Sequence, residues 1–469
     1  MAVTNRTSYV TLGGDITPGG IVRKYVVAAA VATAGSLLPF SIPAAQAGTG
    51  GGPPPSGVVS ARPASSTPRL PARSTPRDQI RQIVQCGSTM YAVGTFSSIK
   101  WGSTSYSRTD LVSFSASSPY RVTSWAPRVV GSTNTDQDGA AAINSIAFNG
   151  GNCADAYIGG NFTRVNGTSV RDIAEISTRT GNVVSGFAHA SNGRVDTLAA
   201  VRGHLLVGGT FTSINGAKPA RMASLNPSTG RGDGFLNLSI RGSQVYNQQL
   251  SHGGTLDLVE GVFSSAGGQS RKQIFMLNVG GSRASVTGWT SRDFGAACTE
   301  SFWARAAAWS PDDSTVYVAT TGFHLVGGSS QGARSGPCDA ALAYPATRSS
   351  VAHKWINYTG CDSLYSAASD GRAAYFGGHE RYSMNPNGCN SLGARGYNAP
   401  GMEGLSPGNG ALYVNSSGSA GYYSRARGLG ADGMLLTRAG LWIASDNLDG
   451  SETCGGVGGH AGICFLPYS

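Results

Sequence analysis

Two stretches of the chain decide its fold because they repeat one another: YIGGNFTRVNGTSVRDIAEISTRTGNVVSGF at 157–187 and LVGGTFTSINGAKPARMASLNPSTGRGDGF at 206–235. Seven residues of the first stretch recur 49 positions later in the second: Gly159, Phe162, Asn166, Gly167, Ala174, Thr180 and Gly181. A period of this size, made of short apolar runs and Gly or Asn turns, indicates a radial or stacked array of β-units.

The core of this repeat, a short apolar strand ending in small residues, recurs along the whole chain. Its copies are YAVGTF (91–96), YIGGNF (157–162), LLVGGTF (205–211), LVEGVF (258–263), VYVATTGF (316–323), AAYFGGHE (373–380) and LWIASD (441–446). Turn pairs such as Asn166-Gly167 and Asn215-Gly216 are typical of hairpins between such strands. The sequence therefore predicts an all-β fold, a β-propeller of seven four-stranded antiparallel blades. Because the later copies are degenerate, six or eight blades are also compatible with the pattern.

The first 77 residues differ in composition from the repeats. Arg23 and Lys24 precede an apolar run that ends in Ala45-Gln46-Ala47, the pattern of a secretory signal peptide. We expect a signal peptide at 1–47, with an uncleaved membrane anchor as the alternative. Residues 48–77 are rich in Pro, Gly, Ser and Thr, which predicts a disordered spacer. The propeller is expected to span 78–469.

The chain has eight cysteines and no CxxC pair, so zinc ribbons and thioredoxin-like chemistry are not indicated. An even number of cysteines behind an export signal predicts disulfides. Pairing of nearest neighbours gives Cys86–Cys153, Cys298–Cys338, Cys361–Cys389 and Cys454–Cys464. The rival pairing joins Cys86 to one of the last two cysteines and would close the ring covalently.

The net charge of +10 comes almost entirely from arginine, since five of the 35 basic residues are lysine. Such a surface attracts anionic partners, for example acidic glycans or cell-wall polymers. No basic run is interleaved with aromatic residues, so a nucleic-acid groove is not indicated. We also expect no integral membrane domain once the signal peptide is cleaved.

The repeat GGxFT…NG…R…A.L…TG…F resembles the delta-60-type propeller repeat of secreted actinobacterial proteins, and similar repeats occur in fungal cortical polarity-landmark proteins. The resemblance covers 78–469 and is clearest in the second and third copies. It implies a propeller fold and an extracellular location, but no activity. The chain departs from that pattern at Ala444-Ser445-Asp446, where "GSD" is expected, and over the Gly/Ser/Tyr-rich stretch 408–430.

Polar residues at the ends of the repeated strands are the candidate ligand-binding residues. His379, Glu380 and Arg381 follow the sixth copy, His324 follows the fifth, and Asp446 ends the seventh. If these positions correspond, the side chains face one another at the mouth of the central channel, where they could bind an anion, a sugar or a metal. The alternative is that they satisfy one another and nearby main-chain groups.

Other chemistry finds little support in the sequence. Gly328-Ser329-Ser330-Gln331-Gly332 matches G-x-S-x-G without the strand–helix context of a nucleophile elbow. Walker A, HExxH and dinucleotide motifs are absent. Asp446, Asp449 and Gly450 resemble part of a calcium loop but lack five spaced oxygen donors. No cofactor and no metal site is therefore predicted, with calcium as the alternative.

Together these features predict a secreted binding module for a carbohydrate or cell-wall polymer, or for an extracellular protein partner. Several of the seven tryptophans could stack on sugars, which favours carbohydrate; the alternative is that they pack between blades. The alternative is an extracellular hydrolase or lyase in which histidine and acidic residues meet at the channel mouth, so catalysis stays open.

Overall fold

The computed structural model describes residues 58–60, 62–72, 78–132, 141–295, 298, 304–322, 337–386, 392, 396–398, 401–413, 431–447 and 460–468. All described residues belong to one compact unit. The predicted signal peptide lies outside the described residues. Within them, no helix is long and apolar enough to cross a membrane.

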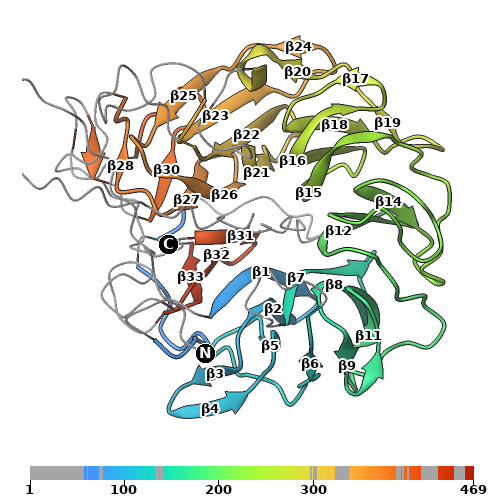
Figure 1. Ribbon diagram of the computed structural model, residues 1–469. Helices are drawn as coiled ribbons and strands as arrows, with labels where there is room; N and C mark the ends of the chain where they lie inside the picture. Colours follow the sequence, from blue (N-terminus) through green and yellow to red (C-terminus); the bar gives the residue numbers. More distant parts are fainter. Residues whose placement is uncertain are drawn as a thin grey trace, which may run out of the picture. The chain divides into compact units, whose positions relative to one another are not determined.

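Seven antiparallel sheets follow one another along the chain (Figure 1). We number them as blades, and the three inner strands of each are as follows: blade 1, β1 (Gln79–Cys86), β2 (Thr89–Thr95), β5 (Leu111–Ser115); blade 2, β7 (Ala142–Asn149), β8 (Asn152–Asn161), β11 (Ile173–Ser177); blade 3, β12 (Val195–Val201), β13 (His204–Gly209), β14 (Met222–Leu225); blade 4, β15 (Ile240–Leu250), β16 (Leu256–Ala266), β18 (Ile274–Asn278); blade 5, β21 (Ala304–Trp309), β22 (Thr315–Thr320), β23 (Ala340–Pro345); blade 6, β26 (Leu364–Ser369), β27 (Ala374–Gly378), β30 (Met402–Leu405); blade 7, β31 (Ala431–Thr437), β32 (Gly440–Ser445), β33 (Ile463–Pro467).

The first strands of the blades form a closed ring. Each first strand contacts that of the next blade, and β31 of blade 7 contacts β1 of blade 1. Each of the seven sequence copies lies on the second strand of its blade. The prediction of an all-β, seven-bladed propeller is therefore confirmed.

The fourth strand is complete in two blades and reduced in the others. Blades 4 and 5 have β19 (Ser285–Val286) and β25 (Trp355–Tyr358). In blades 1, 2, 3 and 6 a single bridge takes its place: Phe114 with Val122, Ile176 with Val183, Leu225 with Gly232, and Leu405 with Leu412.

Short strands lie outside the three inner strands of the blades. They are β3 (Ser98–Trp101), β4 (Thr104–Ser107), β6 (Val129–Val130), β9 (Arg164–Val165), β10 (Thr168–Ser169), β17 (Gln269–Ser270), β20 (Thr290–Ser291), β24 (Ser350–Val351), β28 (Tyr382–Ser383) and β29 (Tyr397–Asn398), with one 3-10 turn, η1, at Arg292–Gly295. Several are hairpins that join the second strand of a blade to its third. Asn166-Gly167 and Asn215-Gly216 have positive φ at both positions, as the predicted hairpin turns require.

Blade 7 takes its fourth strand from the other end of the chain. Val59 bridges Tyr468, and the backbone of Ser60 donates to the carbonyl of Pro467 at 2.7 Å. Further along, Leu70 is fully buried and its N–H donates to the carbonyl of Ala461. We call residues 58–60 and 62–72 the closing segment. For these residues the prediction of a disordered spacer is wrong, because they pack on the folded body and pair with it.

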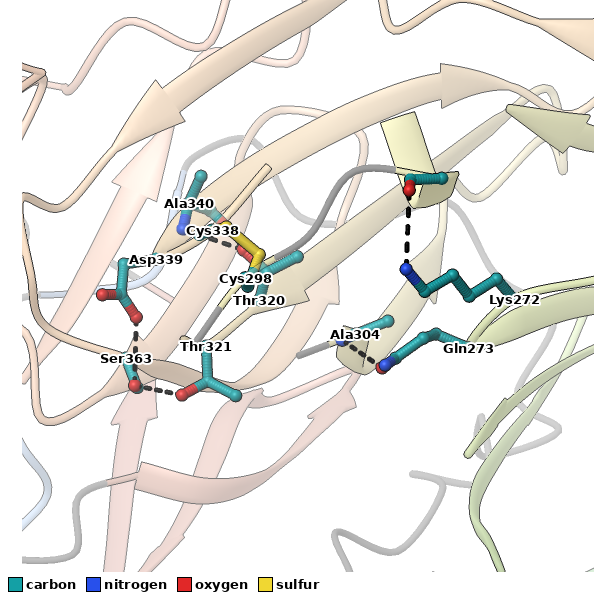
Figure 2. The surroundings of a disulfide bond; sticks show 11 residues. Lys272, Gln273, Cys298, Ala304, Thr320, Thr321, Cys338, Asp339, Ala340 and Ser363 are labelled. Atoms are coloured by element: carbon teal, nitrogen blue, oxygen red, sulfur yellow. Dashed lines mark hydrogen bonds between the residues drawn. A yellow bond between two sulfur atoms is a disulfide. The ribbon is translucent and has the colours of Figure 1, made fainter. Parts of the chain in front are cut away.

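The disulfides follow the nearest-neighbour prediction wherever both partners are described. Cys86 bonds to Cys153, which rules out the rival pairing of Cys86 with the C-terminal cysteines. Cys298 bonds to Cys338, beside the Thr320 hydroxyl that bonds to the backbone of Ala340 (Figure 2). Cys361 and Cys464 are also disulfide-bonded, while their predicted partners Cys389 and Cys454 lie outside the described residues.

Candidate functional site

Every first strand carries a β-bulge at the same place. The register shifts by one residue near the start of β1, β7, β12, β15, β21, β26 and β31. The extra residues are Arg81, Asn144, Asp196, Tyr246, Arg305, Tyr365 and Asp432. Bulges re-aim side chains and are common next to binding sites. Because they occupy the same bulge position on the first strands, which form the inner ring of the propeller, we call them the channel ring.

In blades 1 to 4 the channel ring is held by a chain of hydrogen bonds. Arg81 donates to the amide oxygen of Asn144, whose Nδ2 donates to Asp196 Oδ1 at 3.1 Å. Asp196 also accepts from Arg194 Nε at 2.5 Å and from Gln244 Nε2 at 2.8 Å. Burial and the neighbouring positive charge of Arg194 lower the pKa of Arg81 to about 10, so it stays protonated at neutral pH. This half of the ring is an interlocked polar network.

In blades 4 to 6 the ring consists of an arginine between two tyrosines, and in blade 7 it is an aspartate. The guanidinium of Arg305 lies 5.2 Å from the ring centroid of Tyr246 and 5.6 Å from that of Tyr365, both within cation–π range. Arg305 is 2% exposed, whereas Tyr365 is half-buried. Burial raises the pKa of Asp432 well above its usual range, although Gln79 donates to its carboxylate.

Two of the predicted ligand-binding residues lie beside this ring. His379 Nδ1 is 3.1 Å from the hydroxyl of Tyr365. Asp446 pairs by its backbone with Gln79, and its negative charge contributes to the raised pKa of Asp432. His379 and Asp446 occupy corresponding positions in blades 6 and 7. The pairing of the second strand with the first ends at Gly378 in blade 6 and at Ser445 in blade 7, and each residue follows directly after that point.

The remaining predicted residues are placed differently. Arg381 forms a two-pronged ion pair with Asp362, at 2.7 and 2.9 Å. Glu380 is fully buried next to Glu403, away from solvent. His324 lies outside the described residues, and in blade 5 the position that corresponds to His379 is Thr321.

The channel ring itself was missed by sequence reasoning, which followed the second strands. A signal for it exists in the first strands, where an apolar residue precedes each ring residue: Ile80, Ile143, Val195, Val245, Ala304, Leu364 and Ala431. The ring residue itself varies between Arg, Asn, Asp and Tyr, so identity comparison between repeats does not detect it.

The tryptophans pack between strands instead of offering open stacking faces. Trp125, Trp289, Trp309, Trp355 and Trp442 are all at most 7% exposed. The indole N–H groups of Trp125, Trp289 and Trp355 donate to the carbonyls of Ser177, Pro345 and Pro407. Trp101 is half-buried beside Arg121, and Trp303 lies outside the described residues. For the described tryptophans, the argument for stacking on sugars is therefore lost.

Positive charge collects on the hairpins that follow the second strands of blades 1 to 4. The segments 98–107, 163–171, 212–221 and 264–273 contain no Asp or Glu. We define the basic rim as their solvent-accessible cations together with the cation at the start of β15: Lys100, Arg164, Arg171, Lys218, Arg221, Arg241 and Lys272. All four segments follow strand ends on the side of the channel ring.

A cavity of about 460 Å³ lies on this rim in blade 4. Arg241 and Lys272 line it together with Ser243, Ser264 and Gln273, and its lining contains no acidic residue. Arg221 Nε donates to the carbonyl of Gly242, another lining residue, and Lys272 Nζ donates to the carbonyl of Gly295 (Figure 2). The cavity can therefore receive an anionic group.

A scan against protein-family models finds no match, and a search of curated proteins finds none. Among solved structures, the chain is similar to "Structure of U3-55K", with 9% identity, a TM-score of 0.48, and 87% of this chain and 100% of that chain covered. It is also similar to the WD40 propeller domain of Doa1, with 12% identity, a TM-score of 0.45, and 82% and 95% covered. The extracellular domain of the hybrid two component system BT4673 from B. thetaiotaomicron has 10% identity, a TM-score of 0.42, and 87% and 40% covered. The strand register and blade contacts described above establish the fold: the chain is a seven-bladed β-propeller.

Proposed function

We propose that this propeller is an extracellular binding module that recognises an acidic carbohydrate polymer along the basic rim. The observation that carries the proposal is the run of four hairpins with exposed cations and no acidic residue. A polymer with regularly spaced negative charges can contact several of these cations at once, and its affinity then adds up from weak contacts.

The surface favours such a ligand over a protein partner. Protein interfaces usually have a core of exposed apolar and aromatic side chains. Among the described residues, the large hydrophobic side chains that are exposed are Leu392 and Tyr397. Neither belongs to the basic rim, so the rim offers charge without an apolar core.

The enzymatic alternative loses its sequence-based argument. Clustering of His324, His379, Glu380 and Asp446 around one water-accessible cavity would favour it, and His324 lies outside the described residues. Glu380 and Asp446 are buried, and the cavity on the basic rim is lined by neither of them nor by His379. The binding proposal therefore explains more of the described surface.

Calorimetry of the purified full chain with polygalacturonate, and with neutral dextran as the comparison polymer, tests the proposal. We expect saturable binding of polygalacturonate that weakens with added salt, and no binding of dextran. The double variant Arg241→Ser, Lys272→Ser should bind about tenfold more weakly, a loss of about 1.4 kcal/mol.

The matched control is Arg179→Ser, Arg231→Ser. Both arginines are exposed and lie on turns at the opposite ends of the strands of blades 2 and 3, away from the basic rim. The control variant loses two positive charges, as the rim variant does, so the two have the same net charge. An equal loss of affinity in this control would mean that binding follows net charge and not the rim, and binding of dextran would overturn the proposal.

A further inference from the structure

Blade 6 departs from the other blades at two interior positions. In blades 1 to 4, the carbonyl of Phe96, Phe162, Phe211 or Phe263 accepts a hydrogen bond from the residue that precedes the third strand. In blade 6 the corresponding carbonyl, which accepts from the N–H of Gly401 at 2.7 Å, belongs to Glu380. A glutamate therefore stands where four other blades bury a phenylalanine.

The second departure is on the third strand. Glu403 pairs with Phe376, as Val112 pairs with Ala92 and Ala174 with Ile158 in blades 1 and 2. In blades 3 and 4 the corresponding residues are Ala223 and Phe275. Glu403 is thus a carboxylate at a position that is apolar in the other repeats.

Both glutamates are fully buried, at 0% exposure. By distance and angle none of their four carboxylate oxygens accepts a well-formed hydrogen bond, and the nearest donors are the Ser383 hydroxyl for Glu403 and the main chain at Gly378 and Glu380 for Glu380. Burial raises the pKa of Glu403 to about 8, and burial together with the charge of Glu403 raises the pKa of Glu380 well above its usual range. Two carboxyl groups without a counter-charge at this depth are costly, and buried charges are normally paired or bind a metal.

Neutral oxygen-bearing side chains surround the pair. Ser383 is fully buried beside the carboxylate of Glu403, and Asn357 of β25 in blade 5 donates to its hydroxyl at 3.0 Å. Arg381, the cation nearest in sequence, is engaged by Asp362 through both Nε and Nη2. Ser383 therefore links the carboxyl of Glu403 in blade 6 to Asn357 of blade 5, and the cation nearest in sequence does not neutralise the two glutamates.

We propose that Glu380 and Glu403 form a buried calcium site that fixes the β28–β29 hairpin of blade 6 against blade 5. Calcium takes oxygen ligands in flexible geometry, and two glutamates can supply up to four of them, with the Ser383 hydroxyl as a neutral fifth. Magnesium fits less well, because it gives up its water shell reluctantly and this site is closed to solvent. Among the described residues no group of three or more His, Cys, Asp and Glu could hold a metal, so the site depends on two carboxylates and neutral oxygens.

The test is calorimetric titration of the chelator-treated full chain with calcium chloride, together with thermal melting at each calcium concentration. We expect one equivalent to bind and the melting temperature to rise by about 5 °C. The variants Glu380→Gln and Glu403→Gln should each weaken calcium binding about 100-fold and abolish the calcium-dependent rise in melting temperature.

Glu260→Gln is the matched control. Glu260 is also fully buried beside a second buried carboxyl, Asp257, and the oxygens of both likewise lack a hydrogen-bond partner by distance and angle. This second pair lies on one strand, β16 of blade 4, with the Asn247 side chain beside Glu260. This variant should keep the calcium response. If the blade 6 variants do not fold, elemental analysis of the wild-type chain purified without chelator should still find one calcium per chain. A wild-type protein that neither contains nor binds calcium overturns the proposal, and the same holds if Glu260→Gln abolishes the response as fully as Glu403→Gln does.

Discussion

Blade 2 and blade 7 have the same sheet but are assembled differently. Blade 2 is built from one continuous stretch, with β7, β8, β11 and the bridge of Ile176 to Val183 in chain order. Blade 7 has β31, β32 and β33 from the C-terminal part of the chain and receives Val59 from the N-terminal part. A blade of the first kind can form entirely from local contacts, whereas blade 7 is completed only when Val59 pairs with Tyr468.

This difference indicates that the stability of the ring depends most on the contacts that close it. The repeat supplies each blade with its own hairpins, so local pairing is redundant along the chain. Closure has no such redundancy, because β1, β31 and the closing segment are joined by hydrophobic contacts and hydrogen bonds alone among the described residues. Leu70 and Ile80 lie in the same buried cluster as Trp442 and Phe465 of blade 7.

The largest expected effect is removal of closure. Deleting 58–72 from the full chain should lower the free energy of unfolding by about 5 kcal/mol, because loss of a single buried leucine side chain already costs about 2–5 kcal/mol. Chemical denaturation measures this. As a matched pair, Val59→Ala should cost more than Val183→Ala, since Val59 is fully buried and Val183 half-buried. An equal loss of unfolding free energy in the two variants would mean that Val59 stabilises the protein no more than an ordinary fourth-strand residue does.

The next effect concerns the covalent joint between blades 1 and 2. Cys86 and Cys153 are separated by 67 residues, so their bond restricts a long loop in the unfolded chain. The double variant Cys86→Ser, Cys153→Ser should lose about 4 kcal/mol of unfolding free energy. The control is Cys298→Ser, Cys338→Ser, whose separation is 40 residues and whose loss should be slightly smaller. Full stability of the first variant would show that this joint is held by packing alone.

A smaller effect is expected inside blade 2, where β7 and β8 approach closely. A Cβ atom at Gly160 would lie 2.1 Å from the carbonyl oxygen of Ala142, so the strands must move apart in Gly160→Ala. We expect a loss of about 3 kcal/mol. Gly186→Ala in the same blade is the control, since a Cβ there meets nothing within 4 Å. Thermal melting of both variants tests the cause of the loss. A large decrease in melting temperature in Gly160→Ala alone would show that close approach of the strands requires glycine, and equal decreases would contradict this.

The smallest effect is a pH dependence of closure. His460 Nδ1 lies 3.1 Å from the hydroxyl of Thr67 in the closing segment, and burial together with the charge of Arg69 lowers the pKa of His460 below 6.5. The unfolded chain therefore binds more protons, and this contribution to stability is present above about pH 6.5 and is lost as the pH falls through the folded pKa. We expect a loss of at most about 1 kcal/mol between pH 7.5 and 5.5.

Comparison with His460→Asn isolates this contribution. The pKa of Glu175 is raised to about 7 by burial, which stabilises the folded protein on acidification and opposes the histidine in the wild-type curve. The difference between wild type and variant removes this common background. A difference that does not change with pH would contradict a role for His460.

Most of the fold could be predicted from the sequence because the backbone of each blade depends on short, local patterns. The small residues at the ends of the second strands permit close approach to the first strands, as at Gly160. The third strands of blades 1 to 4 begin after Asp110, Asp172, Arg221 and Gln273, all with left-handed φ between 63° and 72°. This left-handed position cannot be recognised from the sequence, because the residue types differ between blades although the backbone conformation is the same.

The candidate site was predicted in part. His379 and Asp446 were expected near the channel mouth from the strand ends, and register places them beside the channel ring. The bulge residues were not found, because a bulge is a property of two paired strands and cannot be read from one. The buried state of Glu380 was not anticipated either, since burial depends on how the strands of blade 6 pack together.

By itself, the sequence determined the all-β class, the repeated strand and the hairpin turns, and it favoured seven blades and nearest-neighbour disulfides without excluding the alternatives. These depend on residues close in the chain or on a repeat that can be counted. The tertiary structure decided three further features: the closing segment that completes blade 7, the channel ring, and the burial of two glutamates in blade 6. Each of these features joins residues from different blades or strands. The desolvation and the contacts that set their contribution to stability exist only after the ring has closed, so one segment of sequence does not reveal them.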